Sequence, residues 1–225
     1  MYRVYIILLL AFFLTNVKGQ KFYRIKADFS IKSKSFNGAS QLVMGKVYYD
    51  RNLKKLVYLN SFPAIETWVS VDTTVYCIVD NKIYKRLTSP PLSQFSIFHL
   101  ALTSQINNYG LKNTMFKVQK VEKQNNMVIT TWLGPPQYSK IFGRVLISNA
   151  NNKLYGIVFL DQKEKVLRKQ FFNNYQNIDG IEFPTEITDI TYVNDKENYQ
   201  VTTYKNIEVD KISEENLYNY PIPKH

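Results

Sequence analysis

The sequence lacks most of the residues on which disulfide-rich folds and ordinary enzymes depend. Among 225 residues there are one cysteine and two histidines. A single cysteine excludes an intramolecular disulfide, so the fold must rest on its own hydrophobic core. We interpret Cys77, which lies inside the apolar run TVYCIV, as a small buried hydrophobic residue.

Catalytic chemistry has few candidate residues here. His225 ends the sequence, and His99 lies in an apolar stretch that favours a packed or hydrogen-bonded histidine over a catalyst. There is no Ser-x-x-Lys, Gly-x-Ser-x-Gly, His-Glu-x-x-His or phosphate-loop pattern. Carboxylates such as Asp50, Asp80 and Asp161 fall at predicted turns, where they usually bond the backbone. We therefore predict a protein that is not an enzyme and that needs no metal or cofactor.

Long hydrophobic runs are missing too, with one exception at the N-terminus. Arg3 precedes the apolar run Val4–Leu14, and Val17 and Gly19 stand just before an expected cleavage point. A helix that crosses a membrane needs about 20 apolar residues, so a retained anchor is the alternative that fits less well. The pattern predicts a cleaved signal peptide over residues 1–19.

The residue that follows this leader decides between two kinds of exported protein. A lipoprotein would carry its acyl chains on a cysteine at the cut, whereas this chain has Gln20 there. We predict a periplasmic protein that is cleaved near Gly19/Gln20 and is not lipidated. Residues 20–225 contain no repeat or linker and are numerous enough for a single domain with a sizeable core.

The charge is strongly basic, with 29 lysines and arginines against 18 acidic residues. This surplus suits anionic lipid head groups or an acidic partner, but it also serves solubility alone, because the lysines are scattered. Segments such as KFYRIK and NKIYKR interleave aromatic and basic residues, as a nucleic-acid stacking surface does. Any half-buried strand gives the same interleaving, and export argues against that use, so we expect no nucleic-acid partner.

Alternation of apolar and polar residues dominates the sequence and predicts strands. Short turns rich in Asn, Asp and Gly separate them, so neighbouring strands should be antiparallel. We expect a mainly β protein with one inserted helix, in which about 11–13 antiparallel strands form a curved sheet. The predicted strands are Tyr23–Ile31, Leu42–Tyr49, Lys55–Asn60, Ile65–Val71, Thr74–Val79, Ile83–Leu87, Phe116–Glu122, Met127–Leu133, Ile141–Ser148, Leu154–Leu160, Val166–Phe172, Thr185–Tyr192 and Tyr199–Val209.

One stretch interrupts the strands with helical spacing, and it predicts a helix from about Pro91 to Ile106. Apolar residues recur there every three or four positions, at Phe95, Phe98, Leu102 and Ile106. The apolar stripe is wide, so this helix should be buried on more than one side, across the concave face of the sheet. A second short helical turn is expected at Ser213–Tyr218, with Ser213 as its cap.

Aromatic residues make up 15% of the chain, and many fall on predicted strands. A curved sheet covered by one helix needs large side chains to fill the space between them. A plain aromatic core and a cavity that admits a fatty chain both agree with this pattern. The aromatic strand residues are Tyr48, Tyr49, Tyr58, Trp68, Tyr76, Trp132, Phe142, Tyr155 and Phe159.

Four sequence blocks in a fixed order resemble the periplasmic lipoprotein carrier family, the LolA-like proteins, and the related receptor LolB. They are MGKVYYDR at Met44–Arg51, the segment from Phe62-Pro63 to Trp68, CIVDNKIYKRL at Cys77–Leu87 and VTTYKNIEVDKISEENLYNYPIP at Val201–Pro223. The block IDGIEFP at Ile178–Pro184 looks more like the broader lipoprotein-sorting relatives. Family members generally begin with an amphipathic helix, whereas this chain enters a strand at once, so we identify it as a divergent member.

The resemblance implies an unclosed β-barrel with a helical lid over an apolar cavity that receives acyl chains of lipoproteins or related lipids. It also implies a monomer that takes its cargo from an inner-membrane donor and passes it to an outer-membrane acceptor. Residues expected to line the cavity and the lid are Phe95, Phe98, Leu102, Trp68, Trp132, Tyr48 and Phe142. The alternative is an exported interaction or sensor module on the same scaffold, without lipid transfer.

Arg51 matches the arginine that holds the family's lid closed through hydrogen bonds to the lid. A guanidinium suits this task because it presents several donors. The proline that usually follows is replaced by Asn52, and a solvated arginine in a turn is an equally good interpretation.

Overall fold

The computed structural model describes residues 22–89, 95–136, 143–211 and 213–223. Its elements are β1 Arg24–Lys34, β2 Ser40–Asp50, β3 Lys55–Phe62, β4 Glu66–Val71, β5 Thr74–Val79, β6 Lys82–Thr88, α2 Ile97–Leu102, η2 Ile106–Asn108, η3 Leu111–Asn113, β7 Lys117–Gln124, β8 Met127–Leu133, β9 Arg144–Ala150, β10 Lys153–Leu160, β11 Val166–Ile178, β12 Ile181–Val193, β13 Lys196–Val209 and α3 Glu215–Tyr218. The predicted leader and Phe142 lie outside the described residues.

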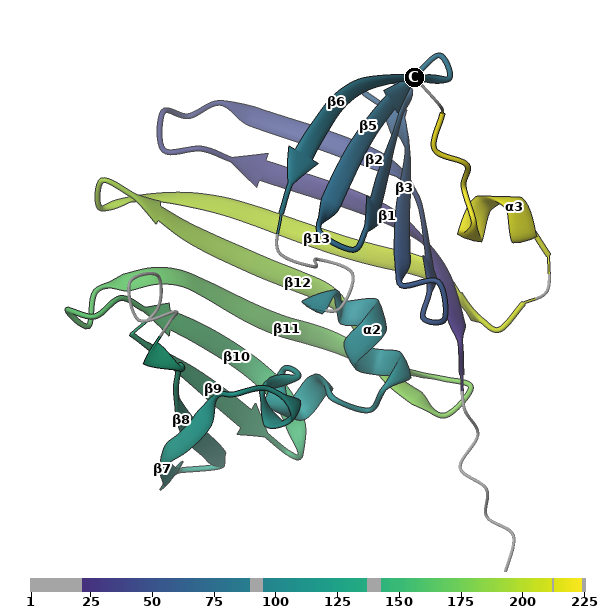
Figure 1. Ribbon diagram of the computed structural model, residues 1–225. Coiled ribbons are helices and arrows are strands. Elements are labelled where there is room, and N and C mark those ends of the chain that lie inside the picture. The colour runs from purple at the N-terminus through teal and green to yellow at the C-terminus, as the bar shows by residue number, and fades with distance from the viewer. Residues whose placement is uncertain (1–21, 90–94, 137–142, 212, 224–225) are drawn as a thin grey trace, which may run out of the picture.

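The strands form one 13-stranded sheet in the order β6-β5-β4-β3-β2-β1-β13-β12-β11-β10-β9-β8-β7. All neighbours are antiparallel, which confirms the fold class expected from the alternation. The chain starts in the middle of the sheet, runs outward to β6, and returns from the opposite edge, β7, to place β13 beside β1 (Figure 1).

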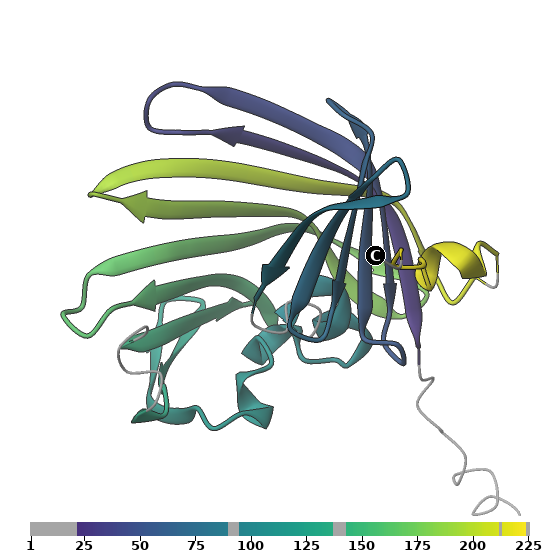
Figure 2. The same ribbon diagram turned by 45° about the horizontal axis from the view of Figure 1, so that its top comes forward.

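This order explains where the helix lies. The segment between β6 and β7 must join the two opposite edges of one curved sheet, and the shortest route crosses its concave side. Figure 2 shows α2 and the two 3₁₀ turns within the curve of the sheet. Within the described residues β6 and β7 do not pair with each other, so the barrel is unclosed.

The helix is shorter than predicted, because capping side chains end it on both sides. The Ser96 hydroxyl accepts a hydrogen bond from the His99 amide, which fixes the start of α2. At the other end the Thr103 hydroxyl bonds the His99 carbonyl, and Ser104 turns to a φ of 56°. The predicted start at Pro91 lies outside the described residues.

The predicted strand positions are confirmed where the structure describes them, and the predicted start at Ile141 lies outside the described residues; β11 and β12 are longer than the alternation indicated. Asn174 adopts a left-handed φ of 55° inside β11, and Pro184 stands inside β12 opposite Tyr175. Asparagine and proline are common turn residues. The sequence pattern therefore ended one strand at Phe172 and began the next at Thr185, whereas the β11–β12 hairpin continues past both positions.

Two apolar clusters lie on the two faces of the sheet. The larger one fills the concave side beneath α2, and the smaller one lies on the convex side beneath α3. The predicted turn at the C-terminus is confirmed as α3, although its N-cap is Glu214 in a left-handed conformation and not Ser213.

Candidate functional site

The concave face and the helix that lies on it form the candidate site. Phe98 and Leu100 of α2 have no exposed surface. The Phe98 ring stacks on Phe183 at 5.7 Å between centroids and meets the edge of Tyr204 at 5.1 Å. The helix thus rests directly on an aromatic floor that β12 and β13 provide.

One polar contact fixes α2 to the sheet beside this aromatic floor. The Tyr49 hydroxyl lies 2.6 Å from His99 Nδ1. Burial raises the pKa of the Tyr49 phenol, so the phenol keeps its proton and donates it to an unprotonated Nδ1. Burial, with the positive charges of Arg51 and Lys54, lowers the pKa of His99 and keeps the imidazole neutral. Both residues are apparent in the sequence, but no local pattern pairs them, because 50 positions separate them.

The structure brings three of the predicted lining residues together. Phe98, Leu102 and Trp132 belong to the concave cluster and are at most 8% exposed. Trp68, in β4, lies on the same concave face of the sheet, where it is the register partner of Tyr58. Its indole nitrogen donates a hydrogen bond to Glu66 at 3.0 Å.

Two other predicted residues lie elsewhere. Phe95 precedes α2 and is 40% exposed, at the edge of the site. Tyr48 points to the convex face, where its ring meets Tyr218 of α3 at 5.3 Å. Alternation along β2 explains this placement, because the neighbours Val47 and Tyr49 take the concave positions.

Arg51 stands at the corner where the resemblance implied a latch. Its amide donates to the Tyr23 carbonyl at 2.8 Å. In the part of the chain that the structure describes, no hydrogen bond joins its guanidinium to α2, and Tyr49 makes the polar contact with the helix. Its positive charge adds to the burial that lowers the pKa of His99.

Two grooves open on the sheet, and one of them touches the seated helix. One, of about 620 Å³, runs between the C-terminal end of α2 and the β11–β12 hairpin, and we call it the hairpin groove. Its apolar wall includes Phe22, Leu102 and Ile181, and at its rim Lys153 and Glu182 form an ion pair at 2.6 Å. The other, of about 580 Å³, lies at the far ends of β1, β12 and β13, away from α2, and we call it the polar groove because most of the residues that line it are polar.

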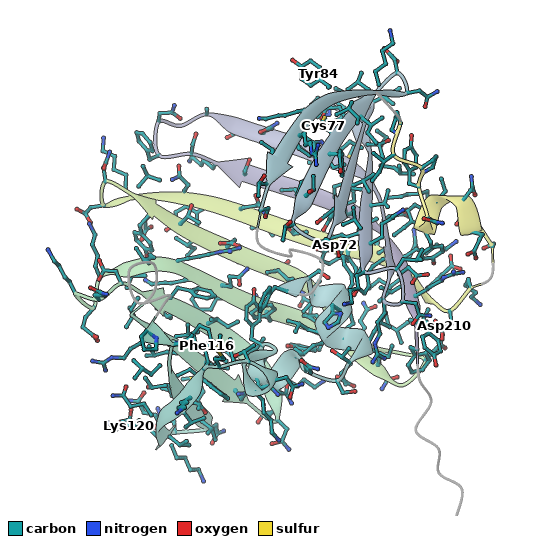
Figure 3. The ribbon with its side chains drawn as sticks, viewed as in Figure 1. Asp72, Cys77, Tyr84, Phe116, Lys120 and Asp210 are labelled. Carbon is teal, nitrogen blue, oxygen red and sulfur yellow. The ribbon has the colours of Figure 1, made fainter. Side chains whose placement is uncertain are left out.

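The last part of the crossover closes the concave cluster on the side of β7 to β9. Phe116, labelled in Figure 3, packs against that cluster from the end of the segment. The Trp132 indole nitrogen is buried there without a hydrogen-bond partner among the described residues. In the part of the chain that the structure describes, no three His, Cys, Asp or Glu side chains lie close enough together to hold a metal ion. No helix in that part is long and apolar enough to cross a membrane.

Comparison with known proteins identifies the fold. No protein-family model and no curated protein matches the sequence. Among solved structures, a LolA superfamily protein from Nitrosomonas europaea matches with a TM-score of 0.61 at 12% identity, covering 88% of this chain and 91% of that one. A DUF1329 family protein from Desulfovibrio piger matches with a TM-score of 0.55 at 11% identity, covering 89% and 91%.

A third structure, a domain assigned to outer membrane lipoprotein sorting from Vibrio parahaemolyticus, matches with a TM-score of 0.52 at 12% identity, covering 88% and 89%. All three likenesses extend over nearly the whole length of both chains. The protein therefore has the LolA-like fold that the sequence blocks indicated, in a divergent form.

Proposed function

We propose that this protein is a non-enzymatic carrier that holds acyl chains of lipoproteins or related lipids between α2 and the concave face of the sheet. The observation that carries the proposal is the seating of α2, an apolar helix that lies on an aromatic floor and is tied to the sheet by the Tyr49–His99 hydrogen bond. Displacing the helix would open an apolar space walled by Phe98, Phe183 and Tyr204.

The driving force is the cost of leaving an acyl chain in water. Burial of each methylene is worth about 0.8 kcal/mol, so a chain of ordinary length can offset the contacts that α2 loses when it moves. In this proposal Leu102 and Trp132 contact the chain, Phe95 and Trp68 stand at its edges, and the tie to Tyr49 reforms on release.

The hairpin groove is the proposed entrance. It reaches the C-terminal end of α2, and its apolar wall continues into the concave cluster through Leu102 and Ile106. The charged rim would meet a polar head group while the chain passes inward.

The predicted leader, residues 1–19, would direct the protein to the periplasm. There residues 20–225 would act as a single domain and as a monomer. Transfer to the outer membrane would require an inner-membrane donor and an outer-membrane acceptor. The absence of a cysteine at position 20 agrees with a carrier that moves between the two membranes.

The experiment expresses the full sequence, purifies the protein from the periplasm without detergent, and identifies bound lipid by mass spectrometry. Emptied protein is then titrated with a dansyl-labelled fatty acid. Phe22→Asp, in the apolar wall of the hairpin groove, should weaken binding at least about tenfold, since a charge replaces an apolar contact. Tyr23→Asp is the matched control, because Tyr23 is 41% exposed and does not line the groove.

A second candidate, an exported interaction module, is favoured by one observation, the tight packing of the core beneath α2, where Phe98 and Leu100 are completely buried. If no lipid is bound after purification and the fatty acid does not bind, the carrier proposal fails and this alternative stands.

A further inference from the structure

The concave face changes from apolar to polar between two adjacent rows of residues. Register partners on the concave face form rows that run across five neighbouring strands, β2, β1, β13, β12 and β11. Two such rows lie next to each other, the outer one nearer the far ends of the strands. The inner row is Val43, Ile31, Thr202, Ile187 and Phe172, and the outer row is Gln41, Ser33, Gln200, Asp189 and Gln170. A third row, Asn198, Thr191 and Arg168, continues the polar surface. Four of the five strands change from apolar to polar at the same level, and β13 is polar in both rows, at Thr202 and Gln200, so this polar area is a single continuous surface.

A charged pair and its supporting residues form the floor of this surface. Asp189 is only 8% exposed, and it accepts hydrogen bonds from Arg168 Nε at 2.8 Å and from Gln170 Nε2 at 2.9 Å. The Gln170 amide oxygen in turn accepts from the Tyr109 hydroxyl at 3.0 Å. Burying a carboxylate is costly unless it is paired, so this chain of bonds, which starts in the crossover, fixes the geometry of the pair.

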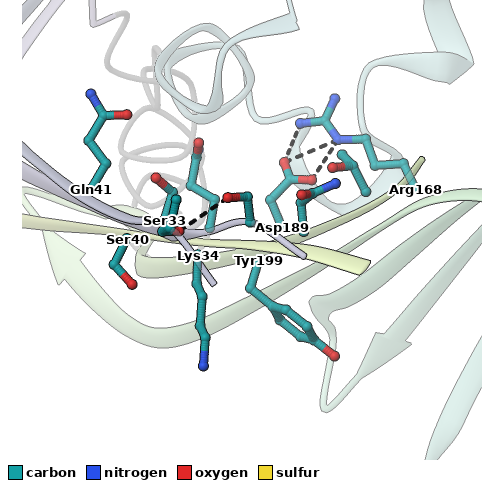
Figure 4. A pocket seen from close by; sticks show the side chains of 12 residues that line it. Ser33, Lys34, Ser40, Gln41, Arg168, Asp189 and Tyr199 are labelled. Carbon is teal, nitrogen blue, oxygen red and sulfur yellow. Dashed lines mark hydrogen bonds and ion pairs between the residues drawn. The ribbon is translucent and has the colours of Figure 1, made fainter. Parts of the chain in front are cut away.

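The groove over this floor is the polar one of about 580 Å³ (Figure 4). Figure 4 shows Arg168 and Asp189 bonded on one side of the sheet, while Lys34 and Tyr199 point to the other side. The register agrees with this view. Lys34 and Tyr199 are partners, and each is next in sequence to Ser33 or Gln200, so their side chains point to the opposite face of the sheet. The charges on the concave side therefore cancel, and side-chain amides and hydroxyls surround them.

We propose that this polar groove binds a neutral saccharide. A sugar hydroxyl both donates and accepts hydrogen bonds, and the groove offers both kinds of group on the exposed side-chain amides of Gln41 and Gln200, beside the Arg168 guanidinium. Pairs of planar polar groups of this kind match vicinal hydroxyls.

Other ligand classes fit less well. An anion would need a cation that is not already paired, and Arg168 is bonded to Asp189. A metal ion would need more than one carboxylate, and Asp189 is the one acidic residue among those that line the groove. An extended peptide needs unpaired backbone, whereas β1, β12 and β13 are paired on both sides.

This inference goes beyond the carrier proposal and does not depend on it, since the groove is open while α2 is seated. The same sugar chemistry has two possible sources, a free saccharide or the head group of a glycolipid. In the second case the lipid chain would run from the polar rows toward the apolar row and the edge of α2.

The test is an amide chemical-shift titration of the ¹⁵N-labelled protein, with its leader removed during export. The probes are methyl glycosides of glucose, galactose, mannose and N-acetylglucosamine, inorganic phosphate, and a monoglycosyl diacylglycerol in nanodiscs. We expect at least one glycoside to shift the amides of Ser33, Thr191 and Gln200, with no saturable response to phosphate. Gln200→Ala, which removes one exposed hydrogen-bonding group, should weaken that binding about fivefold.

Gln176→Ala is the matched control, because Gln176 is an exposed glutamine of β11 that does not line the groove. Its affinity should equal that of the unmodified protein. Stronger binding of the glycolipid than of its free glycoside would identify a lipid head group, and equal binding would identify a free saccharide. The proposal is overturned if no glycoside or glycolipid binds, if phosphate gives the same shifts, or if Gln200→Ala binds unchanged. None of these results depends on fatty-acid binding, so the carrier proposal can fail separately.

Discussion

His99 links the charge of one side chain to the seating of α2. Its Nδ1 can accept the Tyr49 proton only while the imidazole is neutral, and the residues that face it from β2 and the following turn, Tyr49, Arg51 and Lys54, bring no negative charge. Protonation would therefore reverse this hydrogen bond and place a charged imidazole in a buried site beside Arg51 and Lys54, which weakens the seating of the helix.

The pH dependence of stability follows from this arrangement. The pKa of His99 is lower in the folded protein than its ordinary 6.5, so the unfolded chain binds a proton first as the pH falls. The His99 contribution is complete above pH 6.5 and is lost as the pH drops below that value. Urea unfolding between pH 7.5 and 5.0 should show this loss. His99→Asn keeps an acceptor near the Nδ1 position without titrating, and an unchanged pH slope in that variant would refute the assignment.

The sheet has no room for a side chain at Gly45. A Cβ atom built there would lie 2.0 Å from the Leu59 carbonyl oxygen, at the register irregularity between β2 and β3. Since the obstacle is backbone, Gly45→Ala must shift a strand and should destabilise the fold by about 1–3 kcal/mol. The free energy of unfolding in urea measures this. Ala39→Gly, an exposed change in the turn before β2, is the control, and a Gly45→Ala protein as stable as the parent would contradict the argument.

Tyr218 tests the convex cluster with two substitutions at one site. Its ring is completely buried, in contact with Tyr48 and beneath the Arg24 guanidinium at 5.1 Å. Tyr218→Ala should cost about 3–5 kcal/mol, because it leaves a cavity.

The Tyr218 hydroxyl has no partner among the described residues. Tyr218→Phe should therefore leave the stability unchanged or raise it, since it removes a buried group that is not hydrogen-bonded. Denaturation midpoints of the two variants decide the matter: a large loss in Tyr218→Phe would mean that the hydroxyl is bonded.

At the scale of elements, local alternation was enough to predict the strands, because most strands have one face that is more buried than the other. It could not give the strand order. The pairing of β1 with β13 joins residues such as Ile25 and Val209, and no local pattern encodes a contact over that separation. The length of the helix depended on the Ser96 and Thr103 side chains, which a stripe of apolar residues does not reveal.

The candidate site was partly predictable for the same reason. Helical spacing identified Phe98 and Leu102, since both face inward, but residue type alone could not assign Tyr48 to a face. The polar groove left a signal that was missed: Ser33, Asp189 and Gln200 occupy the inward positions that are apolar further along the same strands.

At the scale of the whole molecule, the strand order places the first and last strands of the chain at the centre and the middle of the chain at both edges. The central strands β1, β13 and β12 are paired on both sides and contribute to the concave core. In contrast, every residue of β7 is exposed. The crossover that carries α2 joins the two weakest parts of the sheet, so local opening should begin there and leave the centre intact.

Native-state hydrogen exchange can test this distribution. Amides of β7, and then those of α2, should exchange through local openings of low free energy, whereas amides of β1 and β13 should exchange only on global unfolding. Tyr49→Phe removes the tie to His99 and should speed exchange in α2 alone, by about five- to tenfold for the loss of one hydrogen bond. Equal protection of β7 and β1 would contradict this view of the sheet. Faster exchange of β1 in the Tyr49→Phe protein would mean that α2 unfolds together with the centre, and a helix bound in that way could not move aside to admit a ligand.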